Sequence, residues 1–121
     1  MRIIRSITLL LVIAVSASAA VPVAGNWEGT IKVQNQELRL VLHVREAGGK
    51  LTATFDSLDQ YVAGMPVDSI DLKGQQLNFE IKRLMALYSG TLDKEGKAVN
   101  GSWSQLGMSF PVNFKKAAVK K

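Results

Sequence analysis

Residues 37–46, ELRLVLHVRE, decide the fold class because apolar and polar side chains alternate along them. One face of an extended chain carries four apolar residues, namely Leu38, Leu40, Leu42 and Val44. The opposite face carries Arg39, His43 and Arg45, and Val41 is the exception. A period of two residues is typical of a β-strand with one buried face. The stretch therefore predicts a half-buried strand.

The same alternation recurs along the chain, at residues 51–56, 77–82 and 108–115. Turn-forming residues separate the runs, as in AGGK at 47–50, KGQQ at 73–76, KEGK at 94–97 and LG at 106–107. Connections this short join antiparallel neighbours, because a parallel return needs a crossover of a dozen or more residues. We expect about eight strands, at residues 26–35, 36–46, 50–57, 66–72, 76–83, 86–93, 98–105 and 108–115.

An antiparallel meander with one apolar face can cover that face by closing on itself. The prediction is an all-β fold, an eight-stranded up-and-down barrel in which the first and last strands are neighbours. A two-sheet β-sandwich is the alternative that the same pattern allows. Trp27 and Trp103 are expected near the seam, where their rings can plug the barrel. Pro111 cannot donate to a ladder, so it belongs on an outer last strand or at a bulge.

The inward face of the predicted barrel carries large side chains. The expected buried positions are Trp27, Leu40, Leu42, Phe55, Phe79, Tyr88, Trp103, Phe110 and Phe114, and Met108 shares the inward register of the last strand. Four small residues fall on the same register and could leave room for a ligand, namely Gly29, Ala53, Gly90 and Gly101. An eight-stranded barrel is wide enough to be filled by its own side chains or to hold one small molecule.

Residues 1–20 have the features of a cleaved signal peptide. Arg2 and Arg5 form a positive start, residues 7–15 are apolar, and SASAA at 16–20 offers small residues for cleavage after Ala19 or Ala20. The apolar run is far shorter than the ~20 residues that a membrane span needs. The arginines are not adjacent, and the chain has no Cys that could carry a lipid. We expect export to a bacterial periplasm or beyond by the general secretory route.

The formal charge of +5 belongs mostly to the ends of the chain. Nine Lys or Arg and ten Asp or Glu lie between residues 21 and 114, so the predicted domain is nearly neutral. The predicted organisation is a barrel domain at 21–115 and a basic tail at 116–121. A nucleic-acid interface needs positive charge clustered on the domain, so nucleic acid is not an expected partner.

The sequence favours a protein without catalytic or metal chemistry. No Gly-x-Ser-x-Gly elbow is present, and His43 is the only histidine. We interpret His43 as an outward-facing strand residue near Arg39 or Arg45. Zinc sites draw on several Cys or His ligands, and here one His and no Cys are available. We expect no enzyme activity, no metal and no cofactor.

The connection at residues 58–65, LDQYVAGM, is the longest and most apolar one. Loops at a barrel mouth commonly carry function, although this one could also serve only as a lid. The candidate ligand-binding or partner-binding residues are Trp27, Leu58, Tyr61, Met65, Tyr88 and Trp103.

Short motifs along the mature chain carry a family resemblance. They are GNWEGT at 25–30, GKLTATFDS at 49–57 and GSWSQ at 101–105. Together they resemble a small β-rich domain of secreted bacterial proteins that often precedes an α/β-hydrolase or related serine-hydrolase domain. The architecture is loosely similar to calycins, with Gly25-Asn26-Trp27 where a lipocalin carries Gly-x-Trp. The chain has no residues that match the hydrolase domain, so no catalytic residue is carried over.

The function expected from these observations is a secreted, non-catalytic barrel with an accessory or partner-binding role in the bacterial envelope. The resemblance implies an envelope protein or a separately encoded hydrolase as partner. Two alternatives stay open: a calycin-type barrel for a small apolar ligand, and a detached N-terminal domain of a secreted serine hydrolase. No stable membrane anchor is expected after signal cleavage.

Overall fold

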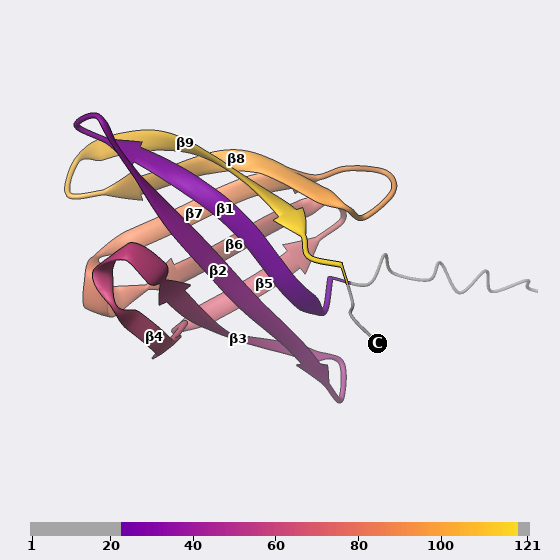
Figure 1. Ribbon diagram of the computed structural model, residues 1–121. Coiled ribbons are helices and arrows are strands. Elements are labelled where there is room, and N and C mark those ends of the chain that lie inside the picture. Colours follow the sequence, from indigo (N-terminus) through magenta and orange to yellow (C-terminus); the bar gives the residue numbers. More distant parts are fainter. Residues whose placement is uncertain (1–22, 119–121) are drawn as a thin grey trace, which may run out of the picture.

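The computed structural model describes residues 23–118, which form nine strands and two short 3-10 turns (Figure 1). The predicted signal peptide lies outside these residues. The strands are β1 (Gly25–Val33), β2 (Gln36–Ala47), β3 (Lys50–Ser57), β4 (Val62–Pro66), β5 (Ser69–Lys73), β6 (Gln76–Ile81), β7 (Ala86–Leu92), β8 (Ala98–Gln105) and β9 (Met108–Lys116). The 3-10 turns are η1 (Leu58–Gln60) and η2 (Lys82–Leu84). No helix among the described residues is long and apolar enough to cross a membrane.

The nine strands form one antiparallel sheet in the order β4-β3-β2-β1-β9-β8-β7-β6-β5 (Figure 1). The all-β prediction is confirmed. The first and last strands are neighbours, as predicted, with Trp27 opposite Lys116 and Gly29 opposite Phe114. The last strand includes Lys116, which the sequence assigned to the tail, and Ala117 N–H still donates to the Asn26 carbonyl.

The two edge strands of the curled sheet, β4 and β5, are consecutive in the chain. At the point between them the backbone bonds to both sides: Val67 N–H donates to the Ala53 carbonyl of β3 (3.0 Å), and Asp68 N–H to the Glu80 carbonyl of β6 (2.8 Å). One continuous segment therefore pairs first with β3 and then with β6. This segment closes the curl, as expected for a meander that becomes a small barrel.

The prediction of eight strands, with a connection at 58–65 and a strand at 66–72, was wrong in its boundaries. The strand begins at Val62, and Pro66 to Asp68 form the switch between β4 and β5. The sequence VAGMP does not alternate cleanly, and Gly64 has a positive φ of 69°. Pairing with β3, across an irregularity between Phe55 and Ser57, makes this segment a strand.

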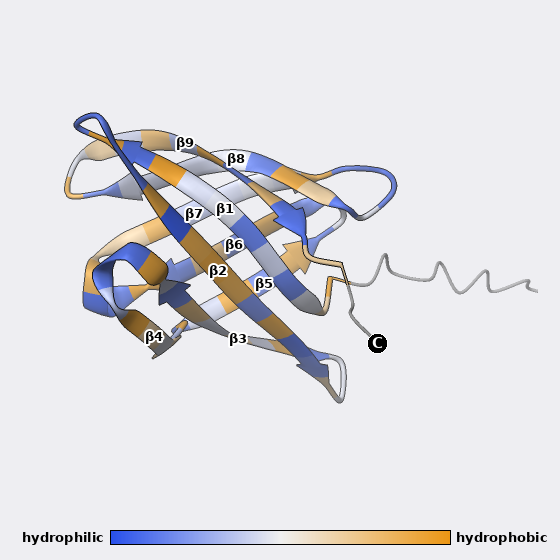
Figure 2. Cartoon of the chain, viewed as in Figure 1, coloured by the Kyte–Doolittle hydropathy of each residue, from blue (hydrophilic) through white to orange (hydrophobic). Residues whose placement is uncertain are grey.

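Apolar and polar residues alternate along the strands, as the colours of Figure 2 show, and the apolar set forms the buried interior. Eight of the nine predicted core residues are buried, namely Trp27, Leu40, Leu42, Phe55, Phe79, Tyr88, Trp103 and Phe114. Phe110 is only half-buried, and Met108 is exposed, which corrects two expectations. Both lie at the start of β9, where the strand projects to the end of the barrel and less of the sheet surrounds it.

The interior is filled by aromatic rings. Phe79 stacks on Tyr88 with ring centroids 5.0 Å apart, and Phe114 meets Tyr88 edge-on at 5.2 Å. The Tyr88 ring lies over the cross-strand pair Gly90 and Gly101, and its hydroxyl donates to the Val112 carbonyl (2.8 Å). Burial raises the pKa of Tyr88 far above its usual value.

The small inward residues therefore leave less room than the sequence suggested. A Cβ added to Gly90 would lie 2.7 Å from the Tyr88 hydroxyl, and one added to Gly29 would lie 2.9 Å from the Phe114 ring. A Cβ on Gly101 would collide with the Ser89 carbonyl and with the Gly90 backbone. These glycines make space that neighbouring aromatic rings already occupy.

Candidate functional site

The two ends of the barrel differ in character. Antiparallel pairing places the carboxyl ends of β1, β3, β6 and β8 at one end, on the left in Figure 1, where they lead into the 34–35 turn, η1, η2 and the 106–107 turn. All six exposed large apolar residues of the described chain lie at this end. We call them the apolar rim: Leu58, Tyr61, Met85, Leu87, Leu106 and Met108. The opposite end has glycine-containing and polar connections.

Three rim residues combine exposure with an unfavourable backbone conformation. Tyr61 (φ 57°), Met85 (φ 52°) and Leu106 (φ 52°) all lie in the left-handed region. Their exposed fractions are 97%, 65% and 69%. A non-glycine residue in this region costs about 1–2 kcal/mol. Burial of an apolar side chain would offset this cost, but these three side chains are exposed. Strain of this kind is concentrated at functional sites.

The turns in which they lie explain why these three residues are left-handed. Tyr61 ends η1, where its N–H donates to the Leu58 carbonyl (3.4 Å), and Met85 ends η2, where its N–H donates to the Lys82 carbonyl (2.9 Å). Each 3-10 turn needs a left-handed residue to return the chain into the next strand. Leu106 and Gly107 both have positive φ, as a two-residue type I′ hairpin requires.

An ion pair fixes η1 to the barrel wall. Arg39 on β2 contacts Asp59 with Nη2 to Oδ1 at 2.8 Å and Nε to Oδ2 at 3.2 Å, and the Arg39 backbone N–H also donates to this carboxylate (2.7 Å). These hydrogen bonds hold the pKa of Asp59 below its usual value. The pair is exposed, so its main effect is to fix the position of η1.

A second polar cluster fixes the far side of the same connection. His43 on β2 bridges Asn26 (Nδ1 to Oδ1, 2.7 Å) and Asp56 (Nε2 to Oδ2, 2.7 Å), and the other Asp56 oxygen accepts the Gly64 N–H (2.7 Å). Burial raises the pKa of Asp56, but the hydrogen bonds from Gly64 and His43 outweigh it and leave the pKa below its usual value. The segment that carries Tyr61 is therefore anchored by a carboxylate on each side.

Side-chain hydrogen bonds also fix η2. Asp68 accepts the Lys82 backbone N–H (2.6 Å), and the Gln105 side-chain amide donates to the Leu84 carbonyl (2.8 Å). Gln105 in turn accepts the Trp103 indole N–H (3.0 Å). The buried ring of Trp103 is thus linked through Gln105 to the turn that presents Met85.

The geometry gives His43 a structural role. Both ring nitrogens have oxygen partners, Asn26 on β1 and Asp56 on β3, so the side chain links three neighbouring strands. His43 lies on the less buried face of β2, where it is half-buried between Asn26 and Asp56. Within residues 23–118, no group of three or more His, Cys, Asp or Glu side chains is arranged to hold a metal ion.

The structure separates the six predicted site residues into two groups. Leu58 and Tyr61 belong to the apolar rim, and Met65 is half-buried against the core, opposite Phe55. Trp27, Tyr88 and Trp103 are interior residues. Trp27 donates its indole N–H to the Val23 carbonyl (2.9 Å) and has the Lys116 ammonium 5.7 Å from its ring centroid. Trp103 packs against Phe55 and Phe79, so the two tryptophans do not form one site.

Sequence reasoning missed four rim residues, Met85, Leu87, Leu106 and Met108. One signal was present for Met85. Phe55-Asp56 precedes Tyr61 as Phe79-Glu80 precedes Met85, with the same spacing, and each stretch forms a strand end, a 3-10 turn and a left-handed residue. This internal similarity would have paired Met85 with Tyr61.

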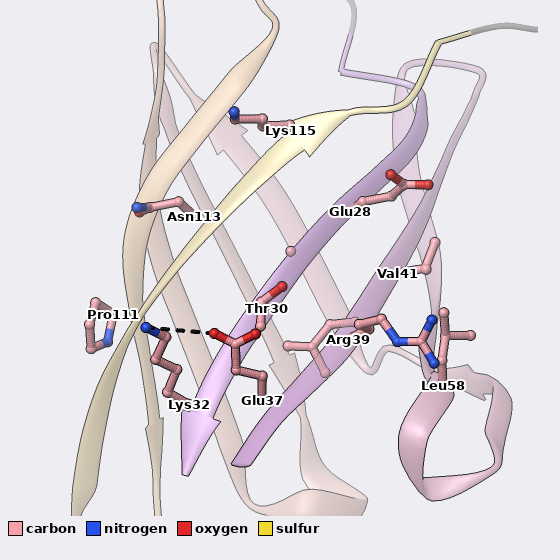
Figure 3. A pocket seen from close by; sticks show the side chains of 12 residues that line it. Glu28, Thr30, Lys32, Glu37, Arg39, Val41, Leu58, Pro111, Asn113 and Lys115 are labelled. Atoms are coloured by element: carbon pink, nitrogen blue, oxygen red, sulfur yellow. Dashed lines mark ion pairs between the residues drawn. The ribbon is translucent and has the colours of Figure 1, made fainter. Parts of the chain in front are cut away.

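A shallow groove of about 770 Å³ runs over the outer face of β1 and β2 (Figure 3). It follows from a split in the seam, because the β1–β9 ladder ends at Gly29 opposite Phe114 although both strands continue. If the register between β1 and β9 continued, Lys32 would lie opposite Pro111. Pro111 has no N–H to donate to β1, so it cannot extend the ladder. The groove is open to solvent. Charged side chains line it, and two of them, Lys32 and Glu37, form an ion pair (3.6 Å). These features favour a solvated surface over a ligand site.

No protein-family model matches the sequence, and a search of curated proteins finds no match.

Proposed function

We propose that the protein is an exported, non-catalytic β-barrel module that attaches to another component of the bacterial envelope through its apolar rim. The observation that carries the proposal is that Tyr61, Met85 and Leu106 are exposed and left-handed at the same end of the barrel. The turns need left-handed residues at these positions, but the fold gains little from large apolar side chains there, so binding is the best reason for their presence. The anchored η1 and η2 hold these side chains ready for contact, which reduces the entropy lost on binding.

The filled interior supports attachment by the rim over binding of a small molecule inside. A ligand would have to displace the rings of Phe79, Tyr88 or Phe114, which pack on one another. Displacing a buried aromatic side chain from its packed position is comparable to truncating it, which costs about 3–5 kcal/mol.

The proposed location is the periplasm or the exterior of a bacterial cell, and it rests on the signal-peptide pattern of residues 1–20. The accessory role beside a serine hydrolase, which the family resemblance implies, is compatible with the same rim. The mass of the exported product tests the location: we expect a chain that begins at Ala20 or Val21. A membrane-bound product that retains Met1 would contradict it.

Envelope retention tests the role of the rim. The full chain is expressed in a bacterial host, and the exported protein is divided into envelope-bound and released fractions. The rim variant Tyr61→Ser, Met85→Ser, Leu106→Ser should move to the released fraction. A control variant has three neutral exposed positions changed at the opposite end, Thr52→Ser, Thr91→Ser and Asn100→Ser. It should be retained like the wild type. Equal retention of all three proteins would refute the proposal.

Absence of turnover is the second expectation. The purified protein should hydrolyse no ester, lactam or peptide substrate, because the only histidine, His43, has Asn26 and Asp56 as its partners and no hydroxyl nucleophile. Turnover that His43→Ala abolishes in a folded variant would show that the protein is an enzyme.

A further inference from the structure

We propose that the envelope component which the apolar rim contacts is an anionic lipid surface, with Tyr61, Met85 and Leu106 entering the interfacial layer. This inference rests on the proposed function above and names the partner of that same site. It follows from how the apolar side chains are distributed, from the charges beside them and from the way the turns are held.

The rim presents its apolar side chains at the tips of turns. They come from three connections, η1, η2 and the 106–107 turn, while the fourth connection at this end is the polar Gln34-Asn35 turn (Figure 1). Tyr61 is almost completely exposed, so its ring has hardly any contact with the rest of the protein. A protein partner would need a socket matched to each tip, because protein interfaces are closely packed. A fluid lipid interface accommodates isolated apolar and aromatic side chains without such matching.

Two exposed cations lie in the turn that presents Met85. Lys82 and Arg83 are the first two residues of η2, which Met85 follows. Both are exposed, and neither side chain has a hydrogen-bond or ion-pair partner among residues 23–118. The other cations near this end are neutralised, Arg39 by Asp59 and Lys32 by Glu37.

The acidic groups nearest to η2 are Asp68 and Glu80. Asp68 accepts the Lys82 backbone N–H, and Glu80 lies on β6, the strand that leads into η2. Within η2 itself, both charged residues are cationic. A basic residue near an anionic membrane strengthens binding by roughly fivefold.

The turns are held in place before any contact is made. Asp59 and Asp56 anchor the segment around Tyr61, and Asp68 and Gln105 anchor η2. Insertion of apolar side chains would then require no rearrangement of the barrel. The anionic surface would pair with Lys82 and Arg83 while Met85 enters the layer next to them.

Vesicle sedimentation tests the inference with the purified exported protein. The probes are vesicles of pure phosphatidylcholine and vesicles of phosphatidylcholine and phosphatidylglycerol in equal parts. We expect the protein to bind the anionic vesicles and to bind the neutral vesicles more weakly. Lys82→Gln with Arg83→Gln should weaken binding to anionic vesicles by about 25-fold, as two basic residues predict. The rim variant should lose binding, and the Thr52, Thr91 and Asn100 control should keep it.

Two results would overturn the inference. The first is absence of binding to anionic vesicles. The second is binding that the rim variant retains, which would assign it to other basic residues such as those at 115–121. If vesicles are not bound while envelope retention still depends on the rim, the partner is a protein and the proposed function stands. If retention does not depend on the rim, the proposed function itself fails.

Discussion

Replacement of Tyr61 by Asn should stabilise the protein while it weakens attachment. Tyr61 has φ 57° and is 97% exposed, so the fold carries its conformational strain and gains almost no burial from its ring. Asn enters the left-handed region more readily than Tyr, because its short polar side chain can hydrogen-bond locally. The substitution therefore removes strain and loses little packing.

The size of the effect follows from the backbone term. A left-handed conformation costs an ordinary residue about 1–2 kcal/mol, and Asn avoids part of that cost, so we expect a gain of roughly 0.5–1 kcal/mol. For a domain of this size, the gain corresponds to an increase in Tm of about 2–8 °C. Tyr61→Gly relieves the strain as well, but its more flexible unfolded chain offsets about 0.5–1 kcal/mol.

Urea and thermal unfolding of matched variants provide the assay. Tyr61→Ala keeps the strain and removes only the exposed ring, so its free energy of unfolding should match that of the wild type. Leu87→Asn serves as a control because Leu87 is also an exposed rim residue, but it lies in β7 without a positive φ, so Asn should not stabilise there. Losses of more than about 1 kcal/mol in both Tyr61→Asn and Tyr61→Ala, a typical destabilisation for a point mutation, would show that Tyr61 supports the fold and would refute the reasoning.

Three further predictions concern the interior and the polar anchors. Gly101→Ala should destabilise the protein by about 1–3 kcal/mol, because the added Cβ collides with the Ser89 carbonyl and the Gly90 backbone; an unchanged unfolding midpoint would reveal free space. Small apolar probes should cause no saturable change in tryptophan emission, and saturation at micromolar probe would show a hollow interior. The folded-state pKa of Asp56 is lowered, so the unfolded chain binds more protons in acid. The stability that Asp56 contributes should be present at neutral pH and lost as pH falls below the usual carboxyl range, through the folded pKa. Asp56→Asn should flatten this acid dependence of unfolding, and an unchanged profile would contradict the assignment.

The fold was predictable because burial in a barrel repeats every second residue. The runs through Leu40 and Leu42, and through Leu77, Phe79 and Ile81, left no room for a helical period, and the turn residues fixed their connections. Strand β4 was not predictable in the same way, because Val62–Pro66 contains a Gly and a Pro. Its pairing with β3 depends on a bulge that only the closed sheet defines.

The ends of the strands were the weak point for burial. Met108 and Phe110 share the inward register of Val112 and Phe114, yet Met108 is exposed and Phe110 half-buried. Alternation assigns a side chain to a face, but it does not say whether other strands extend far enough to cover it. That depends on the stagger of the closed sheet.

The candidate site was predictable in part. The apolar 58–65 connection indicated Leu58 and Tyr61, because apolar residues in a loop have no obvious place in the core. Leu106 was hidden in a hairpin turn, and Met85 and Leu87 were hidden in a run that reads as the start of a strand. Their assembly at one end requires the direction of every strand, which follows from the sheet order. The sequence indicates the order only as far as the meander is regular.

Photo-crosslinking in living cells tests most directly the claim that the protein works through its rim. Benzoylphenylalanine is placed singly at Tyr61, Met85 or Leu106, and at Thr52, Thr91 or Asn100 on the opposite end, in the exported chain. We expect adducts with envelope lipid or protein from the first three positions and none from the other three. Adducts from the opposite end alone, or equal yields from both ends, would contradict it.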